Sequence, residues 1–378
     1  MPGSTAGTTA PVSRARTLAQ MYRRFGAADA GSAAGVEGGG GGAATSPLYQ
    51  RVAIALSEND EALRAIETAP ARKRHPSLIL AALHDLALAG RAPALAAAYA
   101  AGDADAAADA AIDTLVQMTE AVVAVAVRRQ IRTIETGQRA AVLYPAIAEA
   151  ARRVNASAVG LIDVGCSTGF NLNVDRVGIT YSNGQSLGDP SSPVQLRCSI
   201  VGNSAIPARA IPEVVARIGV DQDPVDVTDP DDARWLRACL APDQRDPAAR
   251  LEAELALAAT HPPYLLQGDP VEVLPDALGR VPPNALPVVT TTWALSQFPL
   301  ESRLRFLQRL DEAATGRAVA WVSLEGVGVA PAIPTLGDRR ASGDTIVGLA
   351  MYGHTALRAE AVGRCWSRGR FLSWLAGS

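Results

Sequence analysis

The sequence contains almost no lysine, and this scarcity limits its chemistry. Lys73 is the one lysine among 35 lysine and arginine residues, and it lies in the charge cluster Arg72-Lys73-Arg74. P-loop nucleotide hydrolases and Schiff-base enzymes both need a placed lysine. Since a lysine in such a cluster is normally solvated, both classes of enzyme are nearly excluded.

Cysteine and histidine are also scarce, with four of each. Cys166, Cys198, Cys239 and Cys365 are far apart and form no C-x-x-C pair, so the sequence indicates neither a disulfide framework nor a zinc site. The histidines have no pairing at metal-ligand spacing. We therefore predict no metal site, and the unpaired thiols suit a reducing cytoplasm.

Charge of one sign and long apolar runs are lacking as well. The formal net charge is −3, with acidic and basic residues mixed along the chain, so neither nucleic acid nor an anionic membrane is indicated as a partner. The apolar runs, such as residues 121–127, are too short to span a bilayer, and the first residues lack signal-peptide features. We expect a cytoplasmic protein with a small-molecule substrate; the oligomeric state stays open.

Composition and periodicity divide the chain into three segments. Residues 1–44 are rich in Gly, Ala, Ser and Thr and predict a disordered tail. Residues 45–153 repeat apolar side chains at three- and four-residue steps, which predicts an all-α N-terminal cap with breaks at prolines, including Pro145. Residues 154–378 alternate strand and helix patterns and predict an α/β domain with a Rossmann-like doubly wound sheet.

Within the third segment, five buried strands are expected, separated by helices. They are 159–163, 217–221, 264–269, 286–293 and 318–325. The turn signal Ser182-Asn183-Gly184 predicts an inserted hairpin over about 178–210. Residues 346–352 and 364–375 predict an antiparallel pair that closes the sheet.

The segment Leu161-Ile-Asp-Val-Gly-Cys-Ser-Thr-Gly-Phe170 allows two functional interpretations. The strand ends in Asp163, and the glycine-spaced turn after it lets backbone N–H groups approach a ligand at the start of a helix. The same letters match G-x-S-x-G, the turn that presents the nucleophile of serine hydrolases, here Ser167.

The hydrolase alternative would use Ser167 with Asp269 or Asp338 as the orienting acid and His354 as the base. Against it, only helices are expected upstream of the strand, whereas a nucleophile turn follows several earlier strands. Asp163 also has no role in a catalytic triad but suits a nucleoside site. The cofactor interpretation is therefore favoured.

Polar residues follow the predicted strands at the ends that converge on one crevice of a doubly wound sheet. They are Asp163 with the turn Gly165 to Gly169, then Asp221, Asp269, Thr292 with Trp293, and Glu325. Such acids suit ribose hydroxyls and an adenine amine, although each could instead cap a helix. Trp293 could stack on a base or pack in the core.

This arrangement resembles the class I S-adenosylmethionine-dependent methyltransferase fold. Nearly the whole chain after Ser46 is also similar to an uncharacterised bacterial family, domain of unknown function 2332. The motifs that carry this similarity are Ser46-Pro-Leu-Tyr49, Asp163-Val-Gly-Cys-Ser-Thr-Gly-Phe-Asn-Leu172, Gly188-Asp-Pro-Ser-Ser-Pro193, Arg217-Ile-Gly-Val-Asp-Gln-Asp-Pro-Val-Asp-Val-Thr-Asp229 and Trp321-Val-Ser-Leu-Glu-Gly326.

The resemblance implies an S-adenosylmethionine-dependent transferase acting on a small metabolite, with its crevice between the helical cap and the sheet domain. The turn Gly165 to Gly169, which includes Ser167, would hold the methionine portion, Asp221 the ribose and Asp269 the adenine, and Asp163, Asn171, Thr292 and Trp293 would lie beside them in the cofactor crevice. Asn171 and Asp175 stand one helical turn apart, so they could bind a substrate amine or hydroxyl or belong to the helix surface. Glu135, Asp175 or Glu325 could act as the catalytic residue, by holding the acceptor or by taking the one proton that the transfer releases. A non-catalytic binding module is a further alternative.

Three positions depart from these patterns. Ser167 stands where methyltransferases usually have glycine, and Gln138 where the bacterial family has arginine. Asp221 lies about 50 residues beyond the turn, against ~20 in typical folds of this kind. The inserted hairpin accounts for the excess.

Overall fold

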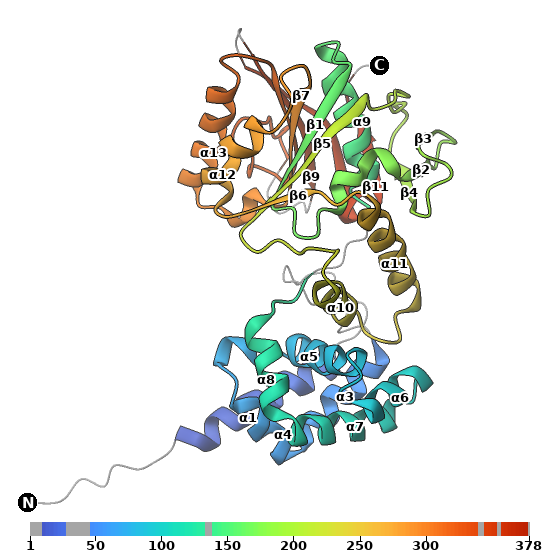
Figure 1. Cartoon of the computed structure of the whole chain (residues 1–378), viewed down its shortest axis with the longest axis vertical. Helices are drawn as coiled ribbons and strands as arrows, with labels where there is room; N and C mark the ends of the chain where they lie inside the picture. The colour runs from blue at the N-terminus through green and yellow to red at the C-terminus, as the bar shows by residue number, and fades with distance from the viewer. Residues whose placement is uncertain (1–9, 28–45, 133–137, 339–343, 354–356, 377–378) are drawn as a thin grey trace, which may run out of the picture. The chain divides into compact units, whose positions relative to one another are not determined.

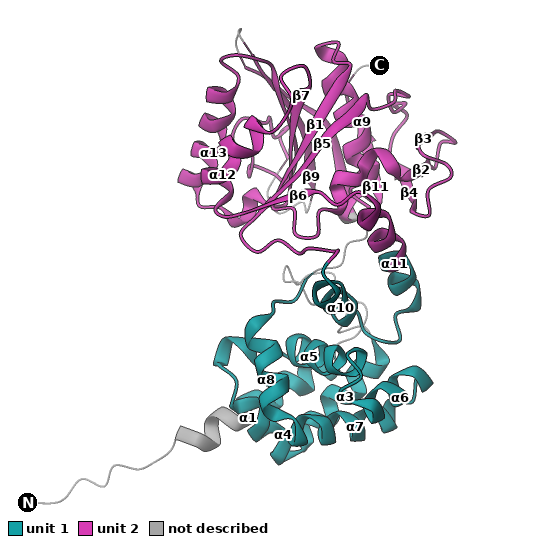
Figure 2. Cartoon of the chain, in the orientation of Figure 1, with its two compact units in different colours: residues 1–134, 229–251 teal, residues 135–228, 252–378 magenta. Residues whose placement is uncertain are grey.

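The computed structural model describes residues 10–27, 46–132, 138–338, 344–353 and 357–376 (Figure 1). They divide into two compact units, coloured separately in Figure 2. Unit 1 comprises Met1–Ile134 and Asp229–Leu251, and unit 2 comprises Glu135–Thr228 and Glu252–Ser378.

The described part of unit 1 is helical. Its elements are α1 (Ala10–Gly26), α3 (Pro47–Glu58), α4 (Asp60–Glu67), η2 (Ala71–Lys73), α5 (Pro76–Leu88), α6 (Pro93–Ala101), α7 (Ala104–Gln117), α8 (Thr119–Arg128) and α10 (Pro230–Ala238). Side chains of Ser46, Asn59 and Asp103 accept backbone N–H groups at the first turns of α3, α4 and α7. The predicted all-α organisation of this region is therefore observed, and polar caps define its helix starts.

Helix α1 corrects the prediction of a disordered tail over residues 1–44. Leu18 and Tyr22 of α1 are buried in the core of unit 1, where the helix packs against α3. The hydroxyl of Tyr22 donates to the carbonyl oxygen of Arg74 at 3.2 Å. The composition of this segment indicated that the entropy cost of ordering it would keep it disordered. Burial of these side chains offsets that cost.

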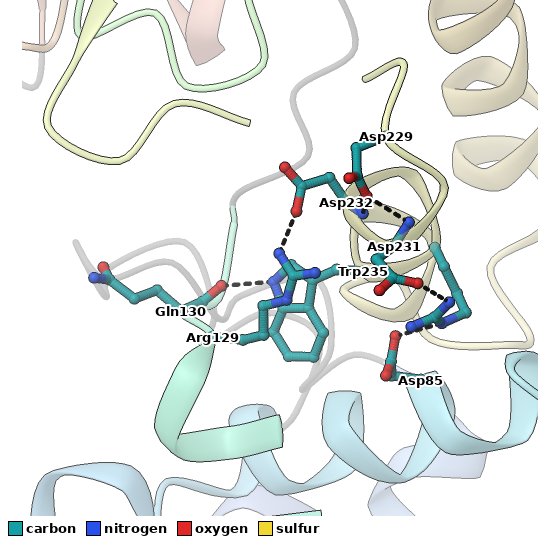
Figure 3. A network of polar contacts seen from close by, with 8 residues as sticks. Asp85, Arg129, Gln130, Asp229, Asp231, Asp232 and Trp235 are labelled. Carbon is teal, nitrogen blue, oxygen red and sulfur yellow. Dashed lines mark hydrogen bonds and ion pairs between the residues drawn. The ribbon is translucent and has the colours of Figure 1, made fainter. Parts of the chain in front are cut away.

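Helix α10 places residues 229–251 in unit 1, although the sequence analysis assigned them to the sheet domain. Trp235 is 1% exposed, and its Nε1 donates to the carbonyl oxygen of Gln130 at 2.8 Å (Figure 3). Arg129 pairs with Asp232 in the same network, and Asp229 caps the helix. The sequence pattern predicted the helix correctly but not the unit into which its tryptophan packs.

Helix α9 (Ala140–Arg153) belongs to unit 2, so the predicted boundary after residue 153 is wrong. The predicted break at Pro145 is also wrong, because Pro145 lies inside α9. Proline has no N–H for the carbonyl four residues before it, which here is that of Ala141. The hydroxyl of Tyr181 donates to this carbonyl oxygen at 2.7 Å and satisfies it.

Unit 2 is built on an 11-stranded sheet in the order β3-β2-β4-β11-β10-β9-β8-β7-β1-β5-β6. Its strands are β1 (Ala158–Val164), β2 (Gly178–Tyr181), β3 (Ser186–Gly188), β4 (Gln195–Ile200), β5 (Glu213–Asp221), β6 (Tyr264–Gln267), β7 (Leu286–Thr292), β8 (Val319–Gly326), β9 (Thr345–Tyr352), β10 (Arg358–Trp366) and β11 (Phe371–Trp374). Strands β6-β5-β1-β7-β8 are all parallel. This is the order of a doubly wound Rossmann-like sheet, with its switch point between β1 and β7.

The remaining strands extend the sheet beyond β8. Strands β8, β9, β10 and β11 are antiparallel neighbours, and β2 and β3 form the predicted hairpin. The partner of β9 is β10, which begins before the predicted segment 364–375, and β11 is a separate strand. Gly369, with a φ of 96°, lies in the short turn η6 (Ser367–Gly369) that separates them.

Helices cover both faces of the sheet, α9 on one side and α12 (Pro270–Gly279) with α13 (Leu300–Ala313) on the other (Figure 1). Along β1, Val159 and Leu161 pack in the cluster with α9, whereas Ile162 and Val164 pack with α12 and α13. This alternation is the two-residue period of a strand buried on both faces. Short helices η3 (Phe170–Arg176) and η4 (Leu295–Gln297) follow β1 and β7, and α11 (Arg245–Thr260) precedes β6.

Within the described residues, no single helix is long and apolar enough to cross a membrane. Two sharply bent helix pairs, α5 with α6 and α7 with α8, reach the required length and composition only when the two members are taken together.

Candidate functional site

A wholly buried carboxyl group lies on the central strand. Asp163 shares the α9 face of β1 with Leu161, two residues earlier. Thr290 Oγ1 donates to one of its oxygens at 2.7 Å, and Asn171 Nδ2 donates to the other at 3.1 Å. Burial raises the pKa of Asp163 to about 6, although these bonds and the positive charge of Arg139 oppose the rise. Strand β1, helix η3 and the start of α9 therefore meet at the carboxyl group of Asp163.

Arg139, immediately before α9, is a cation that the sequence analysis did not single out. Its Nη1 donates to Thr292 Oγ1 at 2.7 Å, and its guanidinium carbon lies 4.6 Å from the centre of the Trp293 ring. Burial lowers the pKa of Arg139, while the negative charges of Asp163 and Glu325 oppose that change. The sequence held one signal for it. The bacterial family has arginine at the position of Gln138, and in this chain the next residue, Arg139, is an arginine.

The turn after β1 folds over the end of β5. Gly165 has a φ of 73° and Ser167 a φ of 51°, both in the left-handed region. The N–H of Gly165 donates to the carbonyl oxygen of Val220 at 2.8 Å, and that of Ser167 donates to a carboxylate oxygen of Asp221 at 2.9 Å. A Cβ on Gly165 would lie 2.7 Å from the Cβ of Ala294. Glycine is therefore needed both for the backbone angle and for packing on η4.

Two carboxylates lie at the neighbouring ends of β5 and β6. The N–H of Gly268 donates to the backbone oxygen of Asp221 at 3.0 Å, which keeps the two strand ends together. Asp269 is exposed and accepts the N–H of Val271 at 2.9 Å, so it caps α12. Asp221 is partly exposed, and its carboxylate orders the turn through Ser167. Both carboxylates therefore have exposed surface that a ligand could contact.

Trp293, directly after β7, has a strained backbone. Its φ of 57° is rare for a bulky residue, and such outliers cluster at functional sites. The conformation is held by Trp293 N–H donating to the oxygen of Leu324 at 2.9 Å and by Nε1 donating to Thr345 Oγ1 at 3.1 Å. These bonds aim the ring so that Arg139 stacks on it.

Glu325, at the end of β8, is buried on the face opposite Asp163. Leu324 of β8 belongs to the core cluster with α9, so the next residue along the strand faces α12 and α13. Glu325 Oε1 accepts the N–H groups of Ala294 at 3.0 Å and Leu295 at 3.1 Å. Burial raises the pKa of Glu325 to about 7, although these two bonds lower it. The side chain therefore caps η4 and titrates near neutral pH.

The other two predicted catalytic residues are not part of this group. Asp175 pairs with Arg217 through two bonds of 2.7 Å. Asn171 and Asp175 are four residues apart and would share a face of an α-helix, but η3 is a 3₁₀ helix with three residues per turn, so they do not share a face here. Glu135 lies outside the described residues.

The predicted partners of a Ser167 nucleophile have other roles or are not described. Asp338 is held by Arg364 through bonds of 2.6 Å and 3.0 Å, and Asp269 caps α12. His354 lies outside the described residues. Across the described part of the chain, no group of three or more His, Cys, Asp or Glu side chains could hold a metal ion.

Comparison with known proteins identifies the family. Residues 38–374 match the family model described as "Uncharacterized protein conserved in bacteria (DUF2332)", so the chain belongs to this family. No curated protein matches the chain.

Proposed function

We propose that this protein is an S-adenosylmethionine-dependent transferase that acts on a small metabolite. One observation carries the proposal: Asp221, at the end of β5, accepts the N–H of Ser167 in the glycine-spaced turn after β1 at 2.9 Å. In doubly wound sheets, ligands bind outside these strand ends, where an acid after the second strand accepts ribose hydroxyls. The resemblance to class I methyltransferases agrees with this placement.

The side chains along this edge fit the cofactor by their chemistry. Asp221 and Asp269 are acceptors at adjacent strand ends, suited to the ribose hydroxyls and the adenine amine. Arg139, Asn171 and Thr292 are linked by hydrogen bonds and suit the carboxylate and amine of an amino-acid end. Gly169 has a φ of 70°, and a Cβ there would lie 3.1 Å from Cγ of Pro263, so glycine suits this end of the turn.

When bound, S-adenosylmethionine supplies a methyl group on a sulfonium, and its transfer needs positioning and the removal of one proton. Glu325 suits proton removal, because burial raises its pKa to about 7. Asp163 suits a positioning role instead, because both of its oxygens already accept bonds from Thr290 and Asn171.

Calorimetric titration with S-adenosylmethionine and S-adenosylhomocysteine tests the proposal. We expect both to bind the wild type, and Asp221→Asn to weaken binding by about tenfold or more, as for loss of hydrogen bonds to a charged group. Asp311→Asn, an exposed substitution on α13, is the matched control and should bind like the wild type. A folded wild type that binds neither compound contradicts the proposal.

The positive φ of Ser167 favours a serine hydrolase as the second candidate, because a nucleophile turn also holds its serine in a strained conformation. A fluorophosphonate probe separates the two. Labelling that is lost in Ser167→Ala but kept in Ser296→Ala would support the hydrolase. The transferase proposal predicts no labelling at Ser167.

A further inference from the structure

A pocket in unit 2 lies away from the carboxyl ends of the parallel strands. Its volume is about 470 Å³, and its lining includes Tyr144, Arg176, Asp189, Glu213 and Arg217. Glu213 begins β5, whereas Asp221 ends it. Eight residue steps of strand separate the two positions, which corresponds to roughly 26 Å. The pocket is therefore distinct from the candidate cofactor site.

The walls of this pocket are fixed by backbone and side-chain contacts. Gly188, with a φ of 76°, is packed so closely that a Cβ would lie 1.9 Å from the oxygen of Val177. The N–H of Asp189 donates to that same oxygen at 3.0 Å. On another wall, Tyr144 accepts the N–H of Ile211 at 3.4 Å. The hairpin and α9 thus hold the pocket's lining in place.

Arg176 brings a guanidinium group to the lining of the pocket. Its Nη1 is buried and has no hydrogen-bond partner among the described residues. The neighbouring carboxylate of Asp175 is occupied by Arg217 through two bonds of 2.7 Å. Burial lowers the pKa of Arg176, and so does the positive charge of Arg217, whereas the negative charge of Asp175 opposes the change. The Arg176 side chain as a whole is only partly buried and lines the pocket, so it brings a positive charge to which an anion from outside the chain could bind.

Negative charge lines the same pocket. Glu213 is exposed and makes no hydrogen bond or ion pair with the described residues. Asp189 is held in place because Ser191 donates to it through both its N–H, at 2.8 Å, and its hydroxyl, at 2.7 Å. Beside the paired Asp175 and Arg217, the lining of the pocket therefore includes the cation of Arg176 and the carboxylates of Asp189 and Glu213, a pattern that complements a ligand carrying both charges.

We propose that this pocket binds a small zwitterion of the α-amino acid type, with its carboxylate on Arg176 and its ammonium on Glu213 and Asp189. The pairing uses charge-assisted hydrogen bonds, which are the stronger class in proteins. The volume of the pocket suits a ligand of this size. The proposal is independent of the transferase activity, because none of its residues belongs to the cofactor site.

Ligand-observed nuclear magnetic resonance with the intact chain tests this, with the twenty standard L-amino acids as probes and acetate and ethylammonium as half-ligands. We expect at least one amino acid to bind saturably, and each half-ligand to bind at least tenfold more weakly. Arg176→Gln should weaken the binding of that amino acid by about tenfold or more. Arg358→Gln, an exposed substitution on β10, is the control and should leave it unchanged.

Glu213→Gln gives a second readout that does not depend on a buried side chain. It should weaken amino-acid binding while leaving acetate binding unchanged, because only the ammonium loses its partner. Absence of saturable binding of any amino acid to the folded wild type would overturn the proposal. Equal binding to wild type and folded Arg176→Gln would overturn it as well.

Discussion

Arg139 and Asp163 form the charged centre of the candidate site, and their energetics depend on each other. Asp163 is wholly buried, and the guanidinium of Arg139 is the positive charge that favours its ionised form. Removal of one member of a buried charged pair leaves the other uncompensated, which is costly. The sequence predicted the acid from its place at a strand end. It could not predict the cation, whose position depends on where α9 begins.

A double-mutant cycle measures this dependence. We expect Arg139→Gln to lower the free energy of unfolding by about 2 kcal/mol, and by clearly less in an Asp163→Asn background. Denaturant unfolding of the four proteins gives the coupling. Arg358→Gln should change stability by no more than about 0.5 kcal/mol. Equal costs in both backgrounds would show that the two charges do not interact.

Glu254 on α11 should make stability depend on pH. It is 1% exposed, and neither carboxyl oxygen has a hydrogen-bond partner among the described residues. Burial raises its pKa from 4.5 to about 8. The native state therefore holds a proton that the unfolded chain releases above pH 4.5, and stability falls as the pH rises from about 4.5 to 8.

Because the pKa is well above its ordinary value, the change in the free energy of unfolding is on the order of several kcal/mol. Glu254→Gln should match the wild type near pH 4.5 and exceed its free energy of unfolding at pH 8. The exposed substitution Glu301→Gln should follow the wild type at both pH values. If the free energy of unfolding of Glu254→Gln depended on pH in the same way as that of the wild type, the pKa of Glu254 could not be raised.

At the scale of elements, local pattern predicted most strands and helices of unit 2. The runs 159–163, 217–221, 286–293 and 318–325 lie on β1, β5, β7 and β8, because apolar strands bounded by acids or glycines have a strong local signature. A break was predicted in helix α9 because proline leaves one helix carbonyl without its N–H donor, and a local sequence pattern does not show which distant residue can replace that donor. The hydroxyl that satisfies its open carbonyl comes from Tyr181, on a strand beyond η3.

Tyr181→Phe tests this explanation of α9. Loss of the hydroxyl leaves the carbonyl of Ala141 unsatisfied in a buried position, and we expect a cost of about 1–3 kcal/mol. In a Pro145→Ala background, the restored N–H of residue 145 can donate to that carbonyl, so the same substitution should cost less. Urea unfolding of the four variants decides the matter, and an undiminished cost would contradict it.

At the scale of the whole molecule, the sequence predicted two structural parts but not their boundary. Helix α10 lies between β5 and β6 in the chain, yet its Trp235 packs in the core of unit 1. Nothing in the local pattern distinguishes a helix that covers the sheet from one that packs elsewhere. Tertiary partners such as Gln130 and Asp85 decide it, and they are about a hundred or more residues away.

Trp235→Ala should therefore destabilise unit 1. Removal of a buried tryptophan costs about 3–5 kcal/mol through lost burial and the cavity left behind. Native-state hydrogen exchange should show faster exchange in α5 and α8 and little change in β1 and β7, which serve as the internal control. Faster exchange confined to the sheet would contradict the assignment of α10.

We propose that a nucleoside cofactor binds at the ends of β1, β5 and β6. Hydrogen exchange of the wild type, with and without saturating S-adenosylhomocysteine, tests it most directly. The account predicts slower exchange in peptides that cover Gly165 to Gly169, Asp221 and Asp269, and unchanged exchange in unit 1 helices such as α7. Exchange that is the same with and without the compound at all three strand ends would contradict the claim.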